Sequence, residues 1–164
     1  MKAYLSKVLS PSIISLLLVS MVVAAPTTFE SDESGFSVWM PSTPSVQVHT
    51  ENTPVGPVTS TTYEATDKEN TYSVTVTQLP SVALMFKGES GILEQARHEL
   101  LKELGAKQTS WDQSRGRLSY KTANRYGEAR LLIADSKLFV INGMANKKGQ
   151  KDMKTFMSSF QRKS

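Results

Sequence analysis

The hydrophobic period of the chain changes after Pro80, and this change constrains the fold more than any other feature. From Tyr72 to Thr77, apolar and hydroxyl-bearing side chains alternate strictly, which is the pattern of a β-strand with one buried face. From Leu93 to Leu104, leucine and alanine side chains fall at the spacing of one helix face. A chain with both periods in this order predicts a group of strands followed by a helix.

We expect the first helix to have Ser90 at its N-cap, because a serine hydroxyl accepts a hydrogen bond from a free backbone N–H group. Gly105 is expected just past its last turn, since glycine readily adopts the left-handed conformation found there. A second amphipathic helix is predicted near the end of the chain. Its apolar side chains are Met153, Phe156, Met157 and Phe160, at positions i, i+3, i+4 and i+7.

The remaining apolar segments have the alternating or β-branched character of strands. They cover residues 36–40, 46–48, 58–66, 117–122, 129–134 and 138–144. Short polar or glycine-containing turns separate them, and neighbouring strands joined by short turns pair in antiparallel fashion. The predicted fold class is therefore α+β, with a central antiparallel β-sheet packed by two helices.

The N-terminal segment predicts export. Lys2 and Lys7 precede an apolar run from Ile13 to Val23, and small residues lead to a cleavage site after Ala24. The run has 11 residues, fewer than the ~20 that a membrane-spanning helix needs. We therefore assign residues 1–24 to a signal peptide, with an uncleaved anchor as the alternative. No transmembrane span is expected after cleavage, and the predicted location is periplasmic or secreted.

The mature chain is divided into two parts by composition. Residues 25–34 are polar and acidic and predict a flexible lead-in, while residues 35–164 form the α+β domain. Loss of Lys2 and Lys7 lowers the formal net charge from +4 to +2. Such a mild charge gives no reason to expect a nucleic-acid partner.

Composition also limits the chemistry that the chain can perform. Cysteine is absent, so the domain has neither disulfides nor thiol chemistry. The two histidines, His49 and His98, do not make a common zinc site without several carboxylates. We therefore predict no metal, no cofactor and no catalytic residue.

Four segments together resemble the PsbP-like domain, an α/β/α sandwich that is also found in a Ran-binding nuclear import factor. They are Gly35–Pro44, Thr53–Val58, Gly127–Ala134 and Phe156–Phe160. The resemblance spans nearly the whole mature chain, and it rests on packing and turn patterns. It implies a non-catalytic accessory or assembly protein that binds a larger partner. No family site residue is carried over, because the chain shows no site motif of the family.

Two groups of basic residues are candidate binding sites. Arg117, Lys121 and Arg130 share one face of the sheet, with Glu128 among them, if the hairpin between their strands has an even loop. The alternative is a solvated sheet edge with ordinary cross-strand pairs.

The second group is Lys147, Lys148 and Lys151, which crowd the positive end of the last helix if that helix begins near Asn146. Together with free N–H groups they would hold an anionic partner, either a protein or an envelope component. The alternative is a set of solvated lysines.

The leading functional hypothesis is an exported, non-catalytic binding or assembly-accessory protein. The alternative is a periplasmic hydrolase or acid–base enzyme whose carboxylates meet only in the folded chain.

Overall fold

A computed structural model describes residues 27–53, 56–68, 70–147 and 150–163. The predicted signal peptide, residues 1–24, lies outside the described residues. The centre of the fold is a seven-stranded sheet in which every neighbouring pair is antiparallel. In spatial order its strands are β3 (Ser45–Thr53), β4 (Gly56–Asp67), β5 (Asn70–Gln78), β9 (Lys137–Ala145), β8 (Tyr126–Ala134), β7 (Arg117–Lys121) and β6 (Lys107–Asp112).

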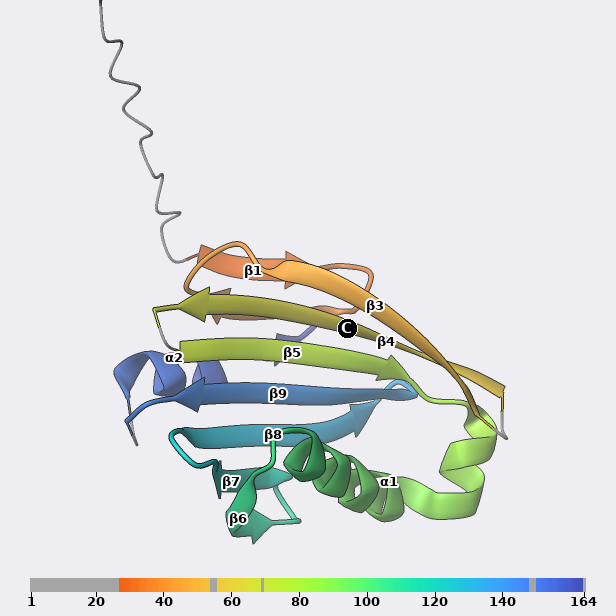
Figure 1. Cartoon of the computed structure of the whole chain (residues 1–164). Coiled ribbons are helices and arrows are strands. Elements are labelled where there is room, and N and C mark those ends of the chain that lie inside the picture. Colours follow the sequence, from red (N-terminus) through yellow and green to blue (C-terminus); the bar gives the residue numbers. More distant parts are fainter. Residues whose placement is uncertain (1–26, 54–55, 69, 148–149, 164) are drawn as a thin grey trace, which may run out of the picture.

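A smaller sheet contains β1 (Thr27–Ser31), β2 (Phe36–Met40) and β10 (Gln161–Arg162), with β2 in the middle. Two helices complete the fold: α1 (Ser81–Glu103), between β5 and β6, and α2 (Lys151–Ser159), between β9 and β10. Figure 1 shows the long strands side by side with α1 next to β8. The α+β class with antiparallel sheets agrees with the sequence-based prediction.

The two helices cover opposite faces of the large sheet. Val140 of β9 packs in the cluster under α1, whereas Ile141, the next residue, packs in the cluster that contains Phe156 of α2. Successive residues of a strand point to opposite faces. The molecule therefore has three layers: α1, the large sheet, and a layer in which α2 and the small sheet lie together.

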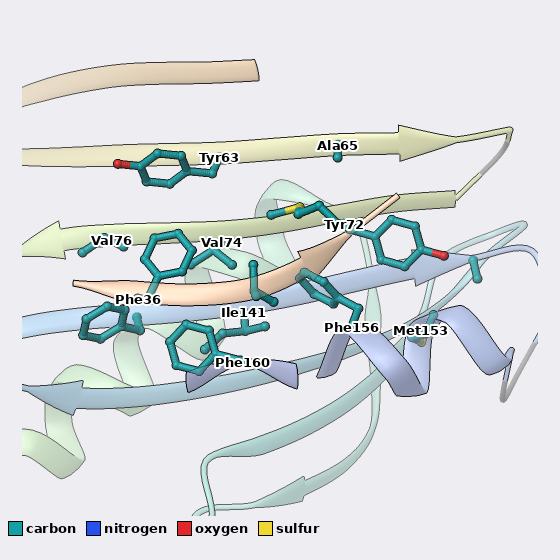
Figure 2. Close-up of a cluster of buried hydrophobic side chains, with 14 residues drawn as sticks. Phe36, Tyr63, Ala65, Tyr72, Val74, Val76, Ile141, Met153, Phe156 and Phe160 are labelled. Atoms are coloured by element: carbon teal, nitrogen blue, oxygen red, sulfur yellow. The ribbon is translucent and has the colours of Figure 1, made fainter. Parts of the chain in front are cut away.

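The main core lies between the large sheet and the layer formed by α2 and the small sheet (Figure 2). Phe36 of β2, Tyr72 of β5 and Phe156 of α2 are all 0% exposed. The ring centroids of Tyr72 and Phe156 lie 5.3 Å apart, and those of Phe36 and Phe160 lie 5.8 Å apart. These separations are typical of packed aromatic pairs, so this core is held by several elements at once.

A second cluster lies on the α1 face of β7 and β8. It contains Leu118, Tyr120, Ala129 and Leu131. The hydroxyl of Tyr120 donates a hydrogen bond to Oδ1 of Asn142 at 2.6 Å. Burial raises the pKa of Tyr120 to about 12, so the ring stays protonated at any ordinary pH.

The predicted strands and the final helix are present, and the end of α1 agrees with its sequence signal. Gly105 has φ 57°, and the N–H of Ala106 donates to the carbonyl of Leu101 at 2.8 Å. This is a Schellman ending. The helix predicted from Ser90 is the second segment of α1, which follows a break at Gly88, where φ is 64° and ψ is 167°. The first segment, which begins at Ser81, was not predicted. Met85 and Phe86, in that first segment, are exposed, so no buried stripe marks it in the sequence.

The flexible lead-in predicted for residues 25–34 is wrong from Thr27 onward, because β1 pairs with β2. Phe29 packs against the main core. The ammonium group of Lys163 lies 2.6 Å from the carboxylate of Glu30 and 2.7 Å from that of Asp32. This contact lowers the pKa of the Asp32 carboxyl, first through its hydrogen bond and then through charge. The acidic residues that suggested a mobile segment thus hold the C-terminal end of the domain.

Candidate functional site

The structure brings the predicted arginines together on one sheet face. Arg117 of β7 lies directly opposite Arg130 of β8, Ser119 lies opposite Glu128, and Lys121 lies opposite Tyr126. The connecting loop, residues 122–125, is even, which is why the hairpin places these side chains on one face.

The Arg117–Arg130 pair is not explained by stability. Like charges directly opposite each other on neighbouring strands are destabilising. Among the described residues, neither guanidinium has a carboxylate within ion-pairing distance. Asp112 lies opposite Arg117 in the next strand, but its carboxylate accepts hydrogen bonds from the Ser114 hydroxyl at 2.6 Å and the Arg115 N–H at 3.2 Å. Asp112 thus bonds within its own turn, and no ion pair joins it to Arg117.

A cleft of about 360 Å³ opens beside the arginine pair. We call it the arginine cleft. Its walls are the turn between β6 and β7, the last part of β8, and one residue of α1. They are lined by Leu93, Gln113, Ser114, Arg115, Gly116, Arg117, Arg130, Leu131, Leu132 and Ile133. Three arginines thus line the cleft together with the buried Leu131 and three half-buried apolar residues, Leu93, Leu132 and Ile133.

Gly116 shapes the cleft because it ends the pairing of β7 with β8. Its φ is 60°, and a Cβ atom there would lie 1.9 Å from the carbonyl oxygen of Leu131. The Leu131 N–H donates to the Gly116 carbonyl at 2.8 Å. From Gly116 the outer chain turns away toward β6, while β8 continues to Ala134.

Lys121 shares the face of the arginines but lies outside the arginine cleft. Its ammonium group lies 5.2 Å from the ring centroid of Tyr126, a cation–π distance. A separate pocket of about 210 Å³ lies between this part of the sheet and Met153 of α2, and Glu128 is in its wall. The carboxylate makes that pocket a poorer place for an anion than the arginine cleft.

The predicted lysine site rested on a helix that begins near Asn146, and that start is wrong. The helix α2 begins at Lys151, with Gln150 as its N-cap. Lys147 precedes it in an irregular segment and is exposed, and Lys148 lies outside the described residues. Only Lys151 stands in the first turn, where Asp152 follows it and is favourable to the helix dipole.

The carboxyl groups whose pKa departs from its ordinary value offer no general acid. The pKa is lowered for Asp32 by Lys163, for Glu94 by Arg97 and for Asp112 by the Ser114 hydroxyl. A catalytic acid needs a raised value. Over the described ranges, no cluster of three or more histidine, cysteine, aspartate or glutamate side chains is placed to hold a metal ion. His49 and His98 are exposed on β3 and α1.

In the part of the chain that the structure describes, no helix is both long enough and apolar enough to cross a membrane. Comparison with known families and with curated proteins gave no match for this chain.

Sequence reasoning found Arg117 and Arg130 but missed Arg115 and Leu93. Arg115 belongs to a turn whose signal is visible in the sequence: an aspartate at 112, a serine at 114 and a glycine at 116. Leu93 has no such signal, because its place in the cleft depends on how α1 crosses β8.

Proposed function

We propose that the mature domain is an exported, non-catalytic binding or assembly-accessory module, periplasmic or secreted, that binds an anionic partner at the arginine cleft. The observation that carries this proposal is the directly opposed pair of Arg117 and Arg130, neither of which forms an ion pair among the described residues. A bound anion would remove the repulsion and form charge-assisted hydrogen bonds with both guanidinium groups.

The resemblance to the PsbP-like α/β/α sandwich supports an accessory role, since such domains bind larger partners. The composition of the cleft agrees with binding, because the three arginines and the glutamine in its lining can donate hydrogen bonds to an anion. No observation favours the alternative of a periplasmic hydrolase or acid–base enzyme.

The cleft is tested with a capped hexaglutamate peptide as the probe, at low ionic strength where charge interactions are least screened. The double variant R117Q/R130Q should bind it about tenfold or more weakly, because it loses two hydrogen bonds to charged groups. The matched control K87Q/K102Q removes two exposed positive charges from α1 and should bind nearly as the wild type does. Equal loss in both variants would show that net charge, and not the cleft, attracts the peptide.

Export is tested separately by mass spectrometry of the protein recovered from its native host. We expect the N-terminus at Ala25 or within a few residues of it. Full-length protein in the cytoplasm would contradict the proposed location and leave the cleft unaffected.

A further inference from the structure

The strand β8 extends past its neighbour and leaves a short free edge at the arginine cleft. β7 begins at Arg117, opposite Arg130, whereas β8 runs on to Ala134. Ala134 and Lys137 close a hairpin with β9 whose two loop residues, Asp135 and Ser136, have φ 50° and 57°. Positive φ at both positions is typical of a type I′ turn.

The turn determines which backbone groups reach the free edge. In a two-residue hairpin the closing pair, here Ala134 and Lys137, is hydrogen-bonded. The residues of β8 therefore direct their N–H and C=O groups alternately toward β9 and toward the β7 side. Leu131 directs these groups toward the β7 side, since its N–H donates to Gly116. Ile133, two residues on, therefore directs its N–H and C=O away from β9 and into the arginine cleft, where no strand of the described chain pairs with it.

We infer that the partner held by the arginine cleft is an extended peptide segment that adds to the β8 edge at Ile133, in line with β7. This inference rests on the proposed function, and it names the chemical class of the partner. Strand addition supplies main-chain hydrogen bonds from the edge, and pockets for alternate side chains supply specificity.

The two faces of the sheet predict the sequence pattern of the segment. A residue placed opposite Leu132 shares the face of Arg117 and Arg130, because residues at i and i+2 lie on one side of a strand. The next residue, opposite Ile133, points to the α1 face, where Ile133 and Leu93 pack against the same apolar cluster. The segment should therefore alternate acidic and apolar side chains.

A small anion, such as inorganic phosphate, would satisfy the guanidinium groups without using the backbone of Ile133 or the apolar wall. The free backbone edge at Ile133 lies between the arginine pair and the apolar wall, and this position favours a peptide ligand. The distinction is experimental, because only a peptide ligand depends on its own backbone N–H groups.

The probe is a capped heptapeptide in which valine and glutamate alternate. N-methylation of its valines removes the N–H groups that would face Ile133, and N-methylation of its glutamates removes those that face away and serves as the matched control. We expect the valine-methylated peptide to bind about tenfold more weakly and the glutamate-methylated peptide to bind as the parent does. Amide hydrogen exchange at Ile133 should slow when the parent peptide is bound.

Equal binding of the two methylated peptides, with the Arg117 and Arg130 dependence intact, would overturn strand addition and leave the proposed function standing. Binding of hexaglutamate and heptapeptide that is unchanged in R117Q/R130Q would overturn both. A heptapeptide with its valines and glutamates in separate blocks should bind more weakly than the alternating one, and equal affinity would contradict the predicted pattern.

Discussion

The two faces of the large sheet differ in how completely they are covered. On one face, β2, β10 and α2 surround a core of aromatic rings, and α2 buries both Met153 and Phe156. On the other face, α1 is a 23-residue helix that buries only Ile92. The long helix thus closes its face less fully than the short one. Stability is concentrated under α2 and the small sheet. The arginine cleft lies at an edge of the large sheet, with its opposed arginines on the face of α2 and with Leu93 and Ile133 on the face of α1.

The largest expected effect comes from the closed face. Phe156→Ala should lower the free energy of unfolding by about 3–5 kcal/mol, because it removes a ring that is packed on all sides. Ile133→Ala is the comparison, since Ile133 is only half-buried on the α1 face and should lose less. Denaturant unfolding measures both. Similar losses in the two variants would show that the faces are equally closed.

The next effect is a pH dependence on the α1 face. The pKa of Tyr120 is about 12 in the folded chain, against an ordinary value of 10. The stability that the neutral hydroxyl of Tyr120 gives the fold is therefore complete below pH 10. As the pH rises from 10 to 12, the free energy of unfolding falls by about 1.4 kcal/mol per pH unit. Tyr120→Phe should be less stable at neutral pH, because Asn142 loses its donor, and should show a flatter decline above pH 10. An unchanged slope in the variant would assign the decline to other groups.

The smallest effect concerns the cleft itself. The variant R117Q/R130Q removes two like charges that face each other on neighbouring strands. Its free energy of unfolding should be unchanged or higher by about 0.2–1 kcal/mol. Thermal unfolding at low salt is the measurement, with R117K/R130K as the variant that keeps the charge. A clear loss of stability in the glutamine variant would mean that the arginines serve the fold.

The sequence predicted strands whose apolar side chains alternate and strands that are continuous apolar runs, because burial on one or on both faces produces these patterns. The strands around Tyr72–Thr77 and Leu118–Tyr120 alternate because their neighbours bury every second side chain. β6 was missed because none of its side chains is fully buried, so nothing in its pattern alternates.

The opposition of Arg117 and Arg130 followed from the length of one hairpin loop, which is local information. The cleft beside them did not, because it needs α1, a turn and the end of β8 to meet. The start of α2 was misplaced because its N-cap is Gln150, which is not one of the residue types that mark a helix start in a sequence.

The central claim is that the arginine pair is retained for a partner. Its most direct test is a titration of the full mature domain with hexaglutamate, followed by the backbone amide signals in two-dimensional NMR. We predict that the largest shifts fall on residues 113–117 and 130–133, and that they vanish in R117Q/R130Q while the K87Q/K102Q control keeps them. Shifts centred on Lys147 and Lys151 would contradict the claim and move the anion to the start of α2.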